Sequence, residues 1–197
     1  RPLLAADVVP DAVIMADPGE LNARHVDGVI PAKTVLIAEQ AVHPPLLRQA
    51  SRRMLFGLGL FPDPLLAEFG LAKAPLNVWG SVATAALDLA CRMEANPVIF
   101  AGQDFAFSWE REYASHTIFH NNVFDPRAGG DREVTDIWGR KVRTTENLVA
   151  YRDFFVRRMR QSPGTRFINA TEGGILTEGT EILSDRKSTR LNSSHVS

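Results

Sequence analysis

One stretch, from Gly80 to Asp104, constrains the fold of this chain more than any other. Its first part, 82–93, is apolar nearly all round, and such a helix packs on most of its sides. Asn96-Pro97 ends this helix, and the short apolar run 97–101 follows. A continuous apolar run of that length is typical of a strand covered on both faces in a parallel sheet. The stretch therefore predicts a buried helix followed by a buried parallel strand.

A single polar line interrupts the apolar helix. Thr84, Asp88 and Arg92 stand at positions i, i+4 and i+8, which places them on one helical face. We expect this line to face solvent, with Asp88 and Arg92 paired along it.

Strand and helix patterns alternate along the rest of the chain. Because the chain contains no internal repeat, this alternation predicts one α/β layered domain with a mostly parallel sheet. The expected strands are 12–16, 34–38, 53–60 and 166–169, and the expected helices are 45–50, 65–69 and 146–160.

Length and composition exclude several classes of protein. The 197 residues carry a formal net charge of −1 and are 45% hydrophobic, as expected for a soluble globular domain. This charge favours neither nucleic acid nor a membrane surface as a partner, and no apolar run reaches the length of a membrane span. The one cysteine stands in the apolar helix, which fits a reducing compartment and a cytoplasmic location.

Two positions around the central stretch suit a ligand. Gly80-Ser81 begins the helix, where backbone N–H groups and the helix dipole favour an anion. Gly102-Gln103-Asp104 follows the strand, and ligands of open α/β sheets bind beyond the carboxyl ends of strands. The alternatives are that Ser81 only caps the helix and that residues 102–104 only form a turn.

Further candidates lie on either side of the central stretch. Asp17 follows the strand 12–16 and suits either a ligand contact or a turn. Residues 108–143 lack clear periodicity, so we expect a partly ordered lid or acceptor-facing segment. Within it, His116 and His120 have the i, i+4 spacing of zinc ligands, but the Glu that usually stands between such ligands is missing. We therefore predict no metal site and consider a surface or structural role for both histidines.

Several nucleotide and nucleophile motifs are absent from the sequence. It contains no phosphate-binding loop, no dinucleotide fingerprint, no Gly-x-Ser-x-Gly elbow and no Asp-x-Asp pair. The phosphate of a nucleotide ligand would therefore meet helix N-termini and neutral donors rather than a metal bound at such a motif.

Three blocks resemble a known family. They are VIMADPGELN (Val13–Asn22), GSVATAALDLACRMEANPVIFAGQDFAF (Gly80–Phe107) and RFINATEGGILTEGTEI (Arg166–Ile182). In order and spacing they resemble the 6-hydroxymethylpterin diphosphokinase-like (MptE-like) domain, and more closely its bacterial branch, the motility accessory factor glycosyltransferases. Thr144-Thr145-Glu146, which follows Gly139-Arg140-Lys141-Val142, also favours the bacterial branch.

The resemblance covers residues 1–184 as one domain and implies a Rossmann-like, sialyltransferase-like fold. It implies an enzyme that transfers a nonulosonic, sialic-acid-like sugar from a CMP-activated donor to Ser/Thr hydroxyls of flagellin, with no required cofactor. One alternative is diphosphate transfer from ATP with Mg²⁺ to a pterin alcohol, where Asp17, Asp104 and Glu172 would hold the metal. Another is a non-catalytic nucleotide-binding or scaffold domain of a motility protein.

With this resemblance, the chemistry of the candidate positions leads to a hypothesis for the role of each residue. Ser81 and the backbone from Gly80 would bind the carboxylate of the sugar or the phosphate of CMP. Asp17, Gln103 and Asp104 would hold the sugar or cytidine, and Glu172 with Gly173-Gly174 would border the same cleft. His116 would deprotonate the acceptor hydroxyl, with His120 as the substitute, and Asp104 is the second candidate catalytic residue.

Both ends of the chain differ from the expected domain. It begins without methionine, and the family's N-terminal phosphate loop has no counterpart, so we expect that loop to lie upstream of Arg1. Residues 185–197 (DRKSTRLNSSHVS) resemble translated sequencing adapter, with a natural unstructured tail as the alternative.

Overall fold

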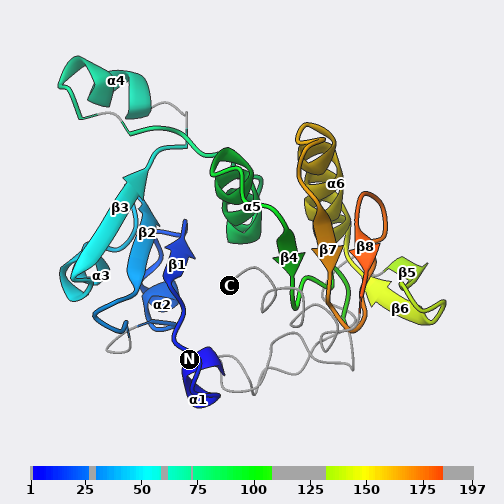
Figure 1. Ribbon diagram of the computed structural model, residues 1–197. Helices are drawn as coiled ribbons and strands as arrows, with labels where there is room; N and C mark the ends of the chain where they lie inside the picture. Colours follow the sequence, from blue (N-terminus) through cyan, green and yellow to red (C-terminus); the bar gives the residue numbers. More distant parts are fainter. Residues whose placement is uncertain (1, 27–29, 59–61, 72, 108–131, 184–197) are drawn as a thin grey trace. The chain divides into compact units, whose positions relative to one another are not determined.

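The computed structural model describes residues 2–26, 30–58, 62–71, 73–107 and 132–183 (Figure 1). Two compact units divide these residues: unit 1 contains the described residues up to Asp88, and unit 2 contains those from Leu89 onward. Each unit has its own parallel sheet. The predicted mixed α/β class with parallel sheets is therefore confirmed.

Unit 1 is built on a parallel sheet of three strands in the order β1-β2-β3. The strands are β1 (Ala12–Met15), β2 (Val35–Glu39) and β3 (Arg52–Phe56), and the short helices are α1 (Pro2–Ala5), α2 (Glu20–Ala23), α3 (Pro44–Gln49) and α4 (Pro62–Glu68). Met15, Ala38 and Leu55 are aligned across the sheet, and α3 adds Leu46 to the core of that face. The alternating strand and helix predictions for residues 12–69 are confirmed within a few residues.

Helix α5 (Val82–Arg92) forms where the apolar segment predicts it. The expected solvent-facing polar line is wrong for Thr84, which is fully buried, and for Asp88, which is 1% exposed, while Arg92 is exposed as expected. The two buried side chains hold the segment that leads into the helix. The Thr84 hydroxyl accepts from the Trp79 N–H at 2.8 Å, and the Asp88 carboxylate accepts from Asn77 N–H at 3.0 Å. The apolar Val82 and Met93 are exposed instead.

Unit 2 contains a second parallel sheet, in the order β4-β7-β8. Its strands are β4 (Val98–Phe100), β7 (Phe167–Asn169) and β8 (Glu181–Ile182), and its long helix is α6 (Glu146–Arg160). Phe155 of α6 packs on Phe100 of β4, with ring centroids 5.4 Å apart, and edge-on against Phe105 at 4.9 Å. These contacts hold α6 against the sheet, and Figure 1 shows the helix beside the strands of this unit.

A hairpin of β5 (Arg132–Thr135) and β6 (Lys141–Thr144) precedes α6. The segment 108–143 is expected to be a partly ordered lid or acceptor-facing segment, and its part 132–143 forms this hairpin, which the sequence patterns did not predict. Residues 108–131 lie outside the described residues. In the described ranges, no helix has the length and apolar character needed to cross a membrane.

Candidate functional site

The polar residues that follow β4 and β7 come together at the carboxyl edge of the unit 2 sheet. The two strands are parallel neighbours, so their carboxyl ends lie at the same edge. The N–H of Gln103 donates to the Thr171 hydroxyl at 3.0 Å, and the N–H of Ile175 donates to the carbonyl of Asp104 at 2.8 Å. Gln103, Asp104, Glu172 and Gly173 are therefore brought into one neighbourhood, which we call the unit 2 edge.

Gly174 allows these two loops to touch. Its φ is +80°, a left-handed backbone that non-glycine residues rarely adopt. A Cβ added at this position would overlap the backbone of Asp104, whose carbonyl carbon would lie 2.6 Å away. The glycine thus sets the approach of the loop after β7 to Asp104.

Asn169 and Thr171 position the loop after β7 and are themselves buried. The Asn169 carboxamide accepts from the N–H of Thr171 at 2.9 Å and donates to the carbonyl of Leu176 at 2.7 Å. The side chains of Asn169 and Thr171 thus form hydrogen bonds within the protein. Glu172 is exposed, and Gln103 and Asp104 are half-buried. These three candidate side chains are therefore accessible to solvent at this edge.

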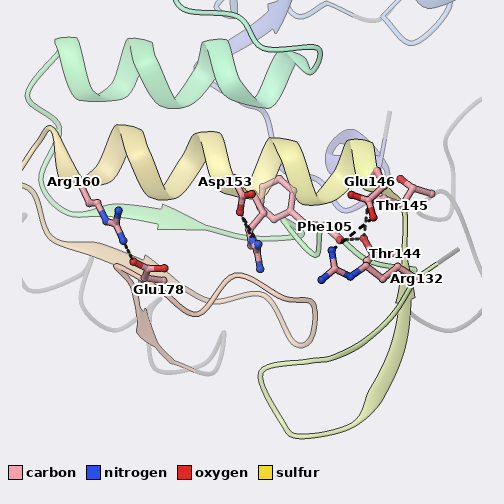
Figure 2. Close-up of polar contacts among 9 residues, drawn as sticks. Phe105, Arg132, Thr144, Thr145, Glu146, Asp153, Arg160 and Glu178 are labelled. Atoms are coloured by element: carbon pink, nitrogen blue, oxygen red, sulfur yellow. Dashed lines mark hydrogen bonds and ion pairs between the residues drawn. The ribbon is translucent and has the colours of Figure 1, made fainter. Parts of the chain in front are cut away.

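The β5–β6 hairpin is attached to the unit 2 edge at several points. Near its tip the Ile137 N–H donates to the carbonyl of Gly174 at 2.9 Å. At its base the hydroxyl of Thr144 donates to the carbonyl of Phe105 at 2.7 Å, as Figure 2 shows. The Phe107 N–H also bonds the carbonyl of Arg143 at 2.8 Å. The hairpin therefore forms one border of this edge.

Helix α6 begins beside the same edge. Thr145 is its N-cap, and the threonine side chain accepts from the Leu148 N–H at 3.3 Å. Glu146, in the first turn, lies 3.7 Å from the guanidinium of Arg132 on β5 (Figure 2). Both residues are exposed, so this pair stabilises the hairpin only weakly.

A buried carboxylate organises the hairpin tip. The Asp136 side chain has no exposed surface, and its oxygens accept from the N–H groups of Trp138 and Arg140, each at 2.8 Å. The Arg140 guanidinium donates to it as well, also at 2.8 Å. Burial acts to raise the pKa of Asp136, but the hydrogen bonds and the charge of Arg140 outweigh burial and hold the pKa below its ordinary value.

Gly80 and Ser81 lie in unit 1 at the start of α5. The Ser81 hydroxyl accepts from the N–H of Ala83 at 3.3 Å, and its carbonyl accepts from the N–H of Thr84 at 3.0 Å. Ser81 is half-buried, and the exposed Gly80 has a φ of +69°. Ser81 thus caps the helix, as one of the two interpretations predicted, and stands at the position proposed for an anion.

Asp17, which follows β1, and Glu39, which is the last residue of β2, both form local turns. Asp17 is exposed and accepts from the Gly19 N–H at 2.7 Å, and the buried Glu39 accepts from the Ala41 N–H at 2.7 Å. The turn-forming alternative therefore accounts for the observed contacts of Asp17, and its assignment to a ligand stays a prediction.

Other expectations lie beyond the described residues. His116 and His120 fall in 108–131, outside the described residues, so their proposed roles stay predictions. In the described ranges, no three His, Cys, Asp or Glu side chains gather where they could hold a metal ion. The sequence arguments missed the roles of Asn169, Thr171 and Asp136. They placed Gly174 with Gly173 at the border of the cleft but missed its close approach to Asp104. The usable signal for the hairpin was Asp136 and Gly139 between two short runs rich in β-branched residues.

Comparisons with known proteins agree with this architecture. A solved structure, that of a MAf glycosyltransferase from Magnetospirillum magneticum AMB-1, matches with a TM-score of 0.72 at 18% identity. The match covers 99% of this chain and 31% of that chain, so this chain spans 31% of the length of that protein. At this identity the match shows the fold alone. A comparison with curated proteins gave no match.

A family model provides the assignment. The model of the 6-hydroxymethylpterin diphosphokinase MptE-like family matches residues 1–110, which is more than half of the chain. These residues include two of the three blocks on which the resemblance was based, and the resemblance is confirmed. The chain belongs to the 6-hydroxymethylpterin diphosphokinase MptE-like family and has the fold of a motility accessory factor glycosyltransferase.

Proposed function

We propose that this chain is part of a glycosyltransferase that moves a nonulosonic sugar from a CMP donor to a Ser/Thr hydroxyl of flagellin. In this reaction the bond between the anomeric carbon of the sugar and the phosphate of CMP breaks, and CMP leaves. A bond forms between the anomeric carbon and the acceptor oxygen, whose proton goes to a base. The fold shared with a MAf glycosyltransferase is the single observation that carries this proposal.

The unit 2 edge has the chemistry to bind the hydroxyl groups of such a donor. Asp104 and Glu172 present carboxylates, and Gln103 presents a carboxamide, at the adjacent ends of β4 and β7. Carboxylate oxygens accept hydrogen bonds from sugar and ribose hydroxyls, while the carboxamide both donates and accepts. We assign Gln103, Asp104 and Glu172 to these hydroxyls, with the Gly173 backbone beside them. Asp104 is also the described candidate for a catalytic carboxylate.

The start of α5 in unit 1 has the chemistry to bind an anion. A carboxylate next to the anomeric carbon and a phosphate are the two negative groups of a CMP-nonulosonate. A helix N-terminus favours either one through its N–H groups and dipole. Within unit 1 by itself, Gly80 and Ser81 are our candidate for binding one such anion. Asp17 is retained as a candidate for the sugar or cytidine, and His116 as the candidate base.

The test is a calorimetric titration of the chain with CMP, comparing Ser81→Gly with the unchanged chain. Glycine keeps the helix start within a few tenths of a kcal/mol of serine, so folding is preserved while the hydroxyl is lost. We expect saturable CMP binding that weakens about tenfold in Ser81→Gly, since a hydrogen bond to a charged group contributes about 1.5–3 kcal/mol.

Ser51→Ala is the matched control, because Ser51 is an exposed serine of the same unit, and it should bind CMP like the unchanged chain. Absence of saturable CMP binding would contradict the glycosyltransferase proposal and favour a scaffold role. Unchanged affinity in Ser81→Gly would contradict only the assignment of Ser81.

The family to which the chain belongs favours one second candidate, ATP-dependent diphosphate transfer to a pterin alcohol. Mg²⁺ is commonly held by one or two carboxylates together with the substrate phosphates, and Asp104 and Glu172 of the unit 2 edge suit that role. ATP binding that requires Mg²⁺, together with no binding of CMP, would favour diphosphate transfer over glycosyl transfer.

A further inference from the structure

The tip of the β5–β6 hairpin presents a large aromatic side chain to solvent. Trp138 is 51% exposed, although an indole of this size contributes most when it is packed. Its neighbour Ile137 is bonded through its N–H to the carbonyl of Gly174, the glycine that contacts Asp104. Trp138 is thus one residue away from a direct attachment to the unit 2 edge.

The backbone that carries Trp138 is rigidly held. Its own N–H donates to the buried Asp136 carboxylate at 2.8 Å, and the same carboxylate binds the backbone and guanidinium of Arg140. Gly139, with a φ of +81°, closes the turn through a 3.0 Å bond from its N–H to the Asp136 carbonyl. A fixed backbone lowers the entropy that is lost when the ring contacts a ligand.

We propose that Trp138 stacks on the flat heteroaromatic ring of the ligand bound at the unit 2 edge. The inference rests on the proposed function, in which that ring is the cytosine of the donor, or a pterin in the second candidate. The side chains of the edge itself are carboxylates and a carboxamide, which suit hydroxyl groups rather than a ring face. The exposed indole of Trp138, on the hairpin whose Ile137 is bonded to Gly174 of this edge, supplies the apolar, polarisable surface on which such rings stack.

The experiment measures the contribution of the ring to affinity separately from that of the rest of the ligand. CMP and ribose 5-phosphate, which lacks the base, are titrated against the unchanged chain, Trp138→Ala and Trp138→Phe. Stacking of a base on an aromatic side chain corresponds to about a 5- to 150-fold change in affinity. We expect Trp138→Ala to weaken CMP binding by about tenfold and to leave ribose 5-phosphate binding unchanged, with Trp138→Phe recovering most of the CMP affinity.

A spectroscopic measurement and a matched control accompany the titration. The chain has three tryptophans, so replacing Trp79 and Trp109 by phenylalanine leaves Trp138 as the only indole emitter, and CMP should quench its emission. Phe69→Ala is the control, because Phe69 is a 70% exposed aromatic residue of unit 1, and it should bind CMP normally.

Failure of the inference is distinguishable from failure of the proposed function. If CMP binds equally well to Trp138→Ala, the stacking role is wrong and the glycosyltransferase proposal stands. If the pterin alcohol and ATP bind but CMP does not, the glycosyltransferase proposal is wrong. In that case, a loss of pterin affinity in Trp138→Ala supports the stacking role. An unchanged pterin affinity in Trp138→Ala overturns the stacking role. If no ligand with such a ring binds, both are wrong.

Discussion

At the scale of single residues, the absence of a Cβ atom at Gly174 decides the local structure. We expect Gly174→Ala to destabilise the chain by about 1–3 kcal/mol or more, because its left-handed φ is strained for alanine and the new Cβ would overlap the Asp104 backbone. Urea unfolding measures the change. Gly164→Ala is the control, since no atom lies within 4 Å of its added Cβ, and it should stay within about 0.5 kcal/mol. Equal effects of the two variants would contradict the close approach.

Asp136 gives the chain a defined acid dependence. Its folded pKa lies below the unfolded value of about 3.9, so its contribution to stability is present above that pH and is lost as pH falls through the folded pKa. At pH 7 we expect Asp136→Asn to be less stable by about 1–3 kcal/mol, because hydrogen bonds to a buried charge are lost. The difference in unfolding free energy between the two chains should shrink as pH falls below about 4. A difference that stays constant with pH would contradict this.

Small polar side chains at strand ends have a shared local role in this molecule. Asp17, Glu39 and Asn169 follow or end β1, β2 and β7, and each accepts a hydrogen bond from the N–H two residues later. A strand followed by polar residues can therefore indicate a turn as well as a ligand site. Sequence reasoning singled out Asp17 among these positions but could not separate the two roles, because both need a side-chain acceptor.

At the scale of elements, α5 shows how burial reverses a sequence pattern. Its length follows from its apolar content and from Asn96-Pro97, and the prediction is accurate there. Thr84 and Asp88 are polar, which predicts exposure, but the segment 77–81 folds back and supplies donors to both. A buried polar group is tolerated when it has a hydrogen-bond partner. Here the partners lie outside the helix, so the periodicity of the helix does not indicate them.

Thr84 provides the test at this scale. We expect Thr84→Val to destabilise the chain by about 1–3 kcal/mol, since the shape is kept while the hydroxyl that accepts from Trp79 and donates to the Ser81 carbonyl is lost. Chemical denaturation measures the loss. Thr180→Val, which removes a hydroxyl with a single exposed hydrogen bond, is the control and should change stability by less than about 0.5 kcal/mol. A Thr84→Val chain as stable as the control would contradict the role of this hydroxyl.

At the scale of the whole molecule, the sequence by itself determined the α/β class, the parallel strands and most helices. Continuous apolar runs and a helix start such as Thr145 are local signals, and local physical preferences decide them. The family resemblance covered the same blocks, and the family model confirms it. The assignments of donor, acceptor and base stay predictions.

Only the tertiary structure decided which distant residues meet. Gln103 bonds to Thr171, Asp104 bonds to Ile175, and Ile137 attaches the hairpin to Gly174, through hydrogen bonds between residues 37 or more positions apart. Strand order and loop approach create these contacts, and neither is encoded in the spacing of residues along the chain. The sequence therefore supplied the chemical groups of the unit 2 edge, and packing of parallel strands supplied their arrangement, because side chains far apart in sequence become neighbours only when the sheet forms.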